Sequence, residues 1–191
     1  MSTHNKYYYA DGQTLSPELL RQEGPTIDVA IEAPEALADA LRKQGKSLSP
    51  QKGKALIDTG ASSSVVDESV IKALQVNAIG KRTVYSVGSE VEEMDTYPAK
   101  FSFPGSTLPQ LDFSSVTASP YLQKQGLIAL IGRDILQYGT LIYHGNGHFT
   151  LVLDPNQKVE RGVIVYKENS APAPSAEISN RDNKAQKGMD W

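Results

Sequence analysis

The stretch that decides the fold reads Ala55-Leu56-Ile57-Asp58-Thr59-Gly60-Ala61-Ser62. An apolar run delivers an acidic residue, which is followed by a small hydroxyl residue and a glycine. Gly60 permits a tight turn in which backbone N–H groups approach the carboxylate, and Thr59 supplies a hydroxyl nearby. We expect the apolar strand to hide the Asp58 carboxylate in a dry interior. Taken alone, Asp-Thr-Gly is also typical of an ordinary turn in which an aspartate bonds its own backbone.

A second stretch, further along the chain, reads Leu130-Ile131-Gly132-Arg133-Asp134-Ile135-Leu136. Its apolar residues predict a strand, and Gly-Arg-Asp then opens a short helix. Between the two stretches, residues 83–87 and 91–103 have the alternation of strands and meet at Gly88-Ser89, which predicts a hairpin. The order is therefore an acidic loop, a hairpin, and then Gly-Arg-Asp within one domain.

These motifs in this order resemble the retropepsin-like aspartic peptidases, and look closest to the bacterial retropepsin-like proteins. The resemblance covers about residues 26–153. It implies an all-β, closed acid-protease domain with one or two short helices, which forms a homodimer. It also implies an endopeptidase in which two Asp58 residues, one from each chain, share a proton. One carboxylate activates a water molecule and its protonated partner donates to the peptide carbonyl oxygen, so that no cofactor or metal is needed.

The resemblance gives roles to individual residues. Asp58 is the catalytic carboxylate, Thr59 bonds across the dimer axis, and Gly60 contacts the site and bound peptide. The residues expected to support the active site are Thr59, Gly60, Ala61, Ser62, Arg133 and Asp134. Those expected to contact substrate are Val87 and Gly88, at the tip of a flap that closes over it, and Leu130 in a subsite.

Two positions change what the resemblance implies. Viral members often have an acid two residues after the glycine, paired with the arginine, and here that position is Ser62. Asp134 and Asp67 are both candidates for the partner of Arg133. Ala61 has no hydroxyl to donate to the carboxylate, so we expect a pH optimum less acidic than in the pepsin-like enzymes.

The remaining periodicity is mostly that of strands. The expected strands are residues 26–33, 54–57, 111–117, 127–131, 141–143 and 149–153, the last two joined by a hairpin turn at 145–147. Helices are expected over residues 35–43 and from a cap at Asp67 through Leu74, with a Glu68–Lys72 pair on its outer face. The run 127–131 suits a strand buried on both sides.

The chain divides into three zones. Residues 1–24 are polar apart from Tyr7-Tyr8-Tyr9, which predicts a loose N-terminal arm; the sequence leaves open whether it is a propeptide or a cover for the groove. Residues 25–167 form the expected domain, which is within the size of one domain for a chain of 191 residues. Residues 168–191 are rich in Ala, Pro, Ser, Asn and Lys, which predicts a disordered tail.

The composition limits the classes of partner and of chemical site that the protein can have. A formal net charge of −3 offers no basic face for nucleic acid or for an anionic membrane. The sequence contains no cysteine, which excludes disulfides, thiolate metal sites and a cysteine nucleophile. Without an apolar leader or a membrane-spanning apolar run, the expected location is the cytoplasm. The expected partners are a second copy of the chain and a peptide or protein substrate.

Three other interpretations compete with the peptidase. The first is a serine hydrolase, because residues 62–64 are serines, but the closing glycine of a nucleophile elbow is absent. His144 and His148 flank a hairpin turn and predict a solvated cross-strand pair, because no third metal ligand accompanies them. The third alternative keeps the fold and loses the chemistry, as a catalytically silent dimerisation or peptide-binding module.

Overall fold

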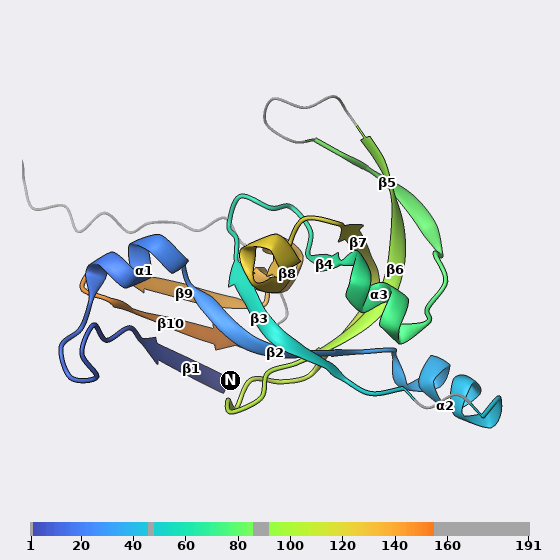
Figure 1. Ribbon diagram of the computed structural model, residues 1–191, viewed down its shortest axis with the longest axis horizontal. Coiled ribbons are helices and arrows are strands. Elements are labelled where there is room, and N and C mark those ends of the chain that lie inside the picture. Colours follow the sequence, from blue (N-terminus) through green and yellow to red (C-terminus); the bar gives the residue numbers. More distant parts are fainter. Residues whose placement is uncertain (1, 46–47, 86–91, 155–191) are drawn as a thin grey trace, which may run out of the picture. The chain divides into compact units, whose positions relative to one another are not determined.

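The computed structural model describes residues 2–45, 48–85 and 92–154, all within one compact unit, Met1–Lys158. The strands are β1 Ser2–Tyr7, β2 Thr26–Glu32, β3 Gln51–Ile57, β4 Val65–Asp67, β5 Gly80–Val84, β6 Glu92–Ser102, β7 Leu111–Ser119, β8 Leu127–Ile131, β9 Gly139–His144 and β10 His148–Leu153 (Figure 1). The helices are α1 Pro17–Glu23, α2 Glu35–Lys43, α3 Glu68–Leu74, the 3-10 turn η1 Gln123–Gln125 and α4 Arg133–Leu136. The expected tail, 168–191, lies outside the described residues, as does the end of the expected domain at 167.

Seven strands form one mixed sheet in the order β2-β3-β8-β4-β7-β6-β5. Residues 30–32 of β2 also pair with residues 100–102 of β6, so the sheet closes on itself. β3 lies parallel to β8, and β4 lies parallel to β7. The predicted closed, mostly β domain is confirmed, but the described residues contain four short α-helices and a 3-10 turn where one or two helices were expected.

Alternating side chains place one face of these strands in the core. On β2, Ile27, Val29 and Ile31 are at most 1% exposed. β8 was expected to be buried on both sides, yet only Leu127, Ala129 and Ile131 are buried, while Ile128 and Leu130 are half-buried. Leu130 is half-buried because it lines a cavity, described below, whereas Ile128 packs against the edge of the core.

Local sequence signals account for the two longer predicted helices. α2 begins and ends where the pattern predicted. The side chain of Asp67 accepts the Ser69 N–H at 3.0 Å and caps α3, and Lys72 bonds Glu68 at 2.9 Å on the outer face. Burial acts to raise the pKa of Asp67, but hydrogen bonds from Ser69, Gln123 and Leu122 outweigh it and hold that pKa below its usual value.

The N-terminal segment is structured, so the prediction of a loose arm over residues 1–24 is wrong. β1 pairs antiparallel with β10, from Ser2 opposite Leu153 to Tyr7 opposite His148. Tyr8 is buried, and its hydroxyl donates to Gly24 O at 2.7 Å and accepts the Thr26 N–H at 3.0 Å. Along β1 half-buried residues alternate with exposed ones, and only the pairing with β10, far away in the sequence, makes this segment an edge strand.

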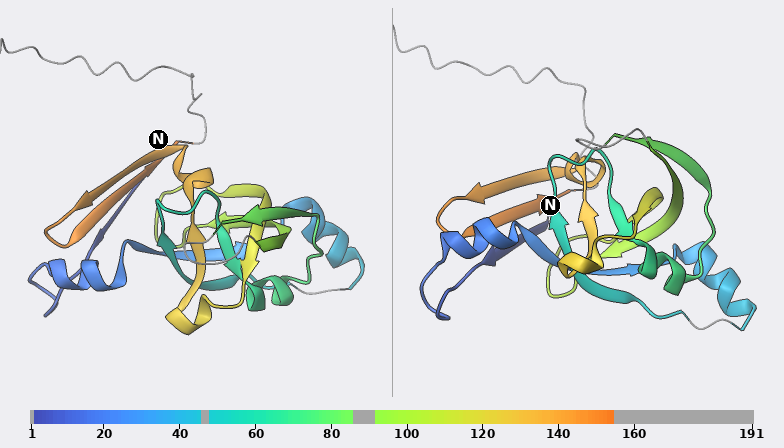
Figure 2. Two further views of the ribbon diagram at one scale, coloured as in Figure 1. Left: turned by 90° about the horizontal axis from the view of Figure 1, so that it is seen from above. Right: turned by 45° about the horizontal axis from the view of Figure 1, so that its top comes forward.

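β1, β10 and β9 form a second, three-stranded antiparallel sheet (Figure 2). The predicted hairpin between β9 and β10 is confirmed, with Tyr143 opposite Phe149. Phe149, Leu151 and Leu153 are fully buried and join the main core, whereas the side chains between them face outward. Within the described residues, no helix combines the length and the apolar character needed to cross a membrane.

Candidate active site

The two sequence motifs lie side by side because β3 and β8 are neighbouring parallel strands. Asp58 directly follows β3, and its N–H donates to Ile131 O at the end of β8 at 2.9 Å. The Arg133 N–H donates in turn to Ala61 O at 3.0 Å. The acidic loop and the Gly-Arg-Asp turn, 70 or more residues apart in the chain, therefore form one structural unit.

Gly60 holds the Asp58 side chain in place. The Gly60 N–H donates to Asp58 Oδ1 at 2.8 Å, and a Cβ at position 60 would lie 3.0 Å from that oxygen. The close approach of backbone to carboxylate explains why the loop has a glycine here. Asp58 is half-buried, whereas Thr59 and Gly60 are exposed. The carboxylate is thus not enclosed in a dry interior within the single chain, because its loop opens onto a cavity.

That cavity has a volume of about 460 Å³ and extends from the Asp58 loop to β5. Among its described lining residues, Asp58 is the single carboxylate, and Arg82 and Arg133 are the two cations. The described residues that line it are Asp58, Gly60, Ala61, Ser62, Ser63, Val65, Arg82, Thr83, Val84, Tyr85, Thr117, Leu130 and Arg133. Leu130 thus lies in the same cavity as Asp58, and its contact with substrate stays a prediction.

Arg133 bonds neither of the two aspartates considered for it. Its Nη1 donates to the carbonyl oxygens of Thr59 at 2.8 Å and Gly60 at 3.1 Å. Asp67 caps α3, and Asp134 binds the backbone and side chain of Ser64. The guanidinium therefore supports the active-site loop through its carbonyl groups, which explains how Ser62 can replace an acid without leaving Arg133 unbonded.

Ser64 and Asp134 form a second link between the two motifs. Asp134 accepts the Ser64 N–H at 2.8 Å and the Ser64 hydroxyl at 2.7 Å, while the Ser64 Oγ accepts the Gly132 N–H at 3.0 Å. Ser64 is fully buried, and a Cβ at Gly132 would lie 2.5 Å from the Ser63 carbonyl carbon. From the sequence alone, Ser64 was considered only as a nucleophile. The signal for its structural role was a polar residue at the start of the buried strand β4, where it needs a hydrogen-bond partner.

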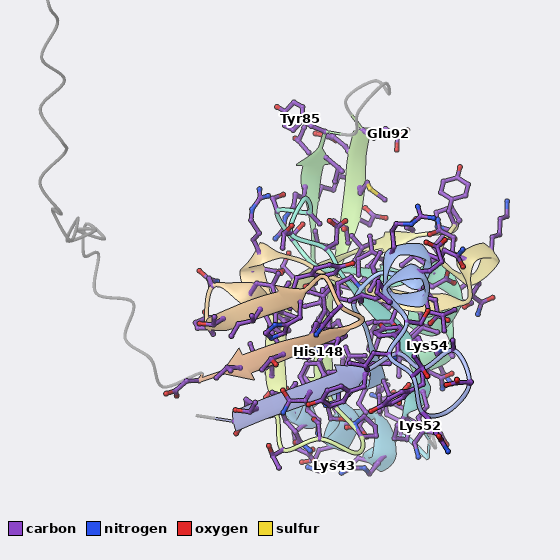
Figure 3. All side chains as sticks on the ribbon, turned by 90° about the vertical axis from the view of Figure 1, so that its left-hand side faces the viewer. Lys43, Lys52, Lys54, Tyr85, Glu92 and His148 are labelled. Atoms are coloured by element: carbon purple, nitrogen blue, oxygen red, sulfur yellow. The ribbon has the colours of Figure 1, made fainter. Side chains whose placement is uncertain are left out.

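β5 and β6 form the predicted hairpin, and Figure 3 shows Tyr85 and Glu92 at its outer end. Val87 and Gly88, the expected flap tip, lie outside the described residues. Arg82 and Val84 face the cavity, which the sequence analysis missed. Alternation along β5 was the available signal, because Lys81, next to the half-buried Arg82, is exposed and does not line the cavity.

His144 and His148 lie away from the cavity, at the turn end of the β9–β10 hairpin. They are cross-strand neighbours, as predicted, and their rings stack with centroids 3.9 Å apart. The Tyr7 ring stacks on His148 at 5.1 Å. Over residues 2–45, 48–85 and 92–154, no three His, Cys, Asp or Glu side chains gather closely enough to hold a metal ion. Desolvation of the ring, and then the charge of His144, lower the pKa of His148.

We expect this hairpin to make folding stability sensitive to mild acid. Because the pKa of His148 is lower in the folded chain than its ordinary value of 6.5, its contribution is complete above that value and is lost as the pH falls below it. Replacing both rings, in His144→Gln/His148→Gln, should reduce the fall in melting temperature between about pH 7.5 and about pH 5. Thermal unfolding followed by circular dichroism at both pH values measures this fall in melting temperature for the wild type and the double variant. His4, whose pKa is also lowered, is present in both the wild type and the double variant, so it does not contribute to the difference between them. An equal fall in both would contradict the expectation.

A carboxylate held beside a glycine at the end of a core strand, under a hairpin and tied to a Gly-Arg-Asp turn, is the arrangement that the resemblance to the retropepsin-like aspartic peptidases implied. Residues 45–135 match a family model described as aspartyl protease. This region contains the Asp58 loop, the hairpin and the Arg133 turn, and the predicted resemblance to the retropepsin-like family is confirmed.

Comparison with individual proteins adds little detail. Among curated proteins, none matches this chain significantly. Among solved structures, the chain is similar to the foamy viral protease-reverse transcriptase in complex with an RNA/DNA hybrid, with 17% sequence identity and a TM-score of 0.38. That similarity covers 60% of this chain and 12% of the viral one.

Proposed function

We propose that this protein is an aspartic endopeptidase whose active site forms between two copies of the chain. The observation that carries the proposal is the placement of Asp58. Its carboxylate ends a core strand, is held by the Gly60 N–H at 2.8 Å, and opens into a cavity of about 460 Å³ beneath the β5–β6 hairpin. A cleft of this size has room for the side chains of an extended peptide.

The chemistry calls for a second carboxylate. Activating water for attack on a peptide requires one ionised carboxylate as base and one protonated carboxyl group as acid. Among the described residues that line the cavity, Asp58 is the single acid. A two-fold axis beside the loop supplies a second Asp58 from the partner chain. The exposure of Thr59 and Gly60 in the single chain supports an axis at this place, since a partner loop would cover both residues.

In the proposed reaction, the two Asp58 carboxyl groups share one proton, because like charges at close range do not both ionise. The ionised carboxylate removes a proton from water, and the resulting hydroxide attacks the peptide carbonyl carbon. The protonated carboxyl group donates to the carbonyl oxygen, and a proton then reaches the leaving amine. Arg133 keeps both loops in shape through Thr59 O and Gly60 O, and takes no part in proton transfer.

The test combines cleavage with oligomeric state. The purified chain is incubated with a diverse peptide mixture across about pH 4 to 8, with and without a statine-type inhibitor, and products are read by mass spectrometry. We expect cleavage that the inhibitor suppresses and, by sedimentation velocity, a dimer at the same concentration. A monomer that cleaves at full rate would refute the shared active site, and an absence of cleavage throughout would favour the silent binding module.

A further inference from the structure

We propose that Arg82 makes this cleft select peptides that carry an aspartate or glutamate side chain close to the bond being cleaved. The proposal rests on the proposed function, because it concerns the substrate of the same site. It concerns the inner face of β5, where Arg82 and Val84 line the cavity that contains Asp58. A cation fixed in the wall of a peptide-binding cleft recognises an anionic side chain by a charge-assisted hydrogen bond.

The contacts of Arg82 leave its charge available. Its Nη2 donates to Ser115 Oγ at 3.1 Å and to Ser115 O at 3.4 Å, and both acceptors are neutral. Within the described part of the chain, no ion pair joins Arg82 to a carboxylate. By contrast its neighbour Lys81, on the opposite face of β5, lies 3.8 Å from Glu93. A guanidinium has five N–H donors, so Ser115 orients the group and leaves several donors for a ligand.

The rest of the cavity favours an anion over a cation. Its described lining carries two guanidinium groups, Arg82 and Arg133, against one carboxylate, Asp58. Arg133 bonds two carbonyl groups of the Asp58 loop. Arg82 bonds a single residue, Ser115, through its hydroxyl and its carbonyl oxygen, and is therefore the cation with more donors left for a ligand. A lysine or arginine side chain of a substrate would meet like charge at this wall, whereas a carboxylate would meet opposite charge.

The neighbours of Arg82 give this subsite a mixed character. Val65, Val84 and Leu130 line the same cavity and supply apolar surface for the methylene groups of an acidic side chain, and the buried Thr117 also lines it. Arg82 itself is half-buried. A carboxylate bound here is thus partly removed from water, where a charge-assisted hydrogen bond is stronger than at an exposed surface.

The experiment reads binding and cleavage separately. The Asp58→Asn protein, immobilised as the full chain, captures peptides from a library of dodecapeptides randomised at every position, and bound peptides are sequenced by mass spectrometry. The same capture is made with Arg82→Met, Arg82→Glu and Lys81→Met, each added to Asp58→Asn. Lys81→Met is the matched control, because it removes the same charge one residue away on the opposite face of the strand. In parallel, the wild type digests the same library.

We expect bound peptides to be enriched in Asp and Glu about three- to tenfold at one position. The enrichment should vanish with Arg82→Met, turn to Lys and Arg with Arg82→Glu, and persist with Lys81→Met. Acidic enrichment that depends on Arg82, without any wild-type cleavage, would uphold the acidic preference of the cleft and refute the peptidase. Cleavage with no acidic preference, or with a preference unchanged by Arg82→Met, would overturn the inference and leave the peptidase standing. Capture with no acidic preference would overturn the inference whether or not the wild type cleaves. A library that does not bind at all would overturn it as well.

Discussion

Replacing Asp58 with Asn should abolish peptide cleavage and leave the fold intact. Asn has the shape of Asp, and its side-chain oxygen can still accept the Gly60 N–H that Asp58 Oδ1 accepts at 2.8 Å. It can no longer take a proton from water. Because general acid–base catalysis accounts for about 10²- to 10⁴-fold in rate, we expect kcat to fall by about 10³-fold or more. Peptide cleavage assays and circular dichroism of the same preparation measure the two halves of this prediction.

Mixing the two proteins separates a shared active site from an independent one. If each site needs Asp58 from both chains, a dimer of wild type with Asp58→Asn is inactive. At constant total chain concentration and after subunit exchange, activity should follow the square of the wild-type fraction, and therefore fall to about one quarter in an equal mixture. If each chain worked alone, activity would fall only to about one half.

The control for mixing is a variant with an intact site. Asp95 is an exposed carboxylate on the outward face of β6, opposite Lys81. An equal mixture of wild type with Asp95→Asn should therefore keep the activity of the wild type alone. A linear dependence on the wild-type fraction in the Asp58→Asn series, with normal exchange shown by light scattering of tagged chains, would refute the shared dyad.

The elements that the sequence predicted well are those whose signals are local. α2 and the cap of α3 at Asp67 follow from hydrophobic spacing and a capping side chain, and both stand where expected. The approach of the Asp58 loop to the Gly-Arg-Asp turn is a long-range feature. It was anticipated through the resemblance to a family, because nothing within either stretch specifies that β3 and β8 become parallel neighbours.

The features that could not be predicted from the sequence depend on contacts between segments far apart in the chain. β1 alternates like any polar segment, and only its pairing with the distant strand β10 makes it an edge strand. Arg133 had two plausible carboxylate partners, yet the Thr59 and Gly60 carbonyls bond it, since a guanidinium accepts any well-placed oxygen. Arg82 shows the same limit: alternation assigns it to one face of β5, but that this face lines the cavity of Asp58 is a property of the closed sheet.

The link between Asp134 and Ser64 leads to the largest stability prediction. Asp134 accepts two hydrogen bonds from Ser64, at 2.8 Å and 2.7 Å, and a third from the Ile135 N–H at 2.9 Å. Ser64 is fully buried, so Asp134→Ala leaves two donors without a partner in a place that water does not reach. Each unsatisfied buried donor costs about 1–3 kcal/mol, which gives a loss of about 2–6 kcal/mol in the free energy of unfolding.

A loss of that size is a large part of the 5–15 kcal/mol that holds a typical domain folded, and it should lower the melting temperature by on the order of 10 °C. Asp134→Asn should be intermediate, because one amide oxygen can accept only part of what two carboxylate oxygens accept. Asp95→Ala, which removes an exposed carboxylate, should change the melting temperature by at most a degree or so. Differential scanning calorimetry measures these melting temperatures. If Asp134→Ala and Asp95→Ala have the same melting temperature, Ser64 has another hydrogen-bond partner. The Asp58 loop would then depend for its position on Arg133, on the Ser64–Gly132 hydrogen bond and on the backbone.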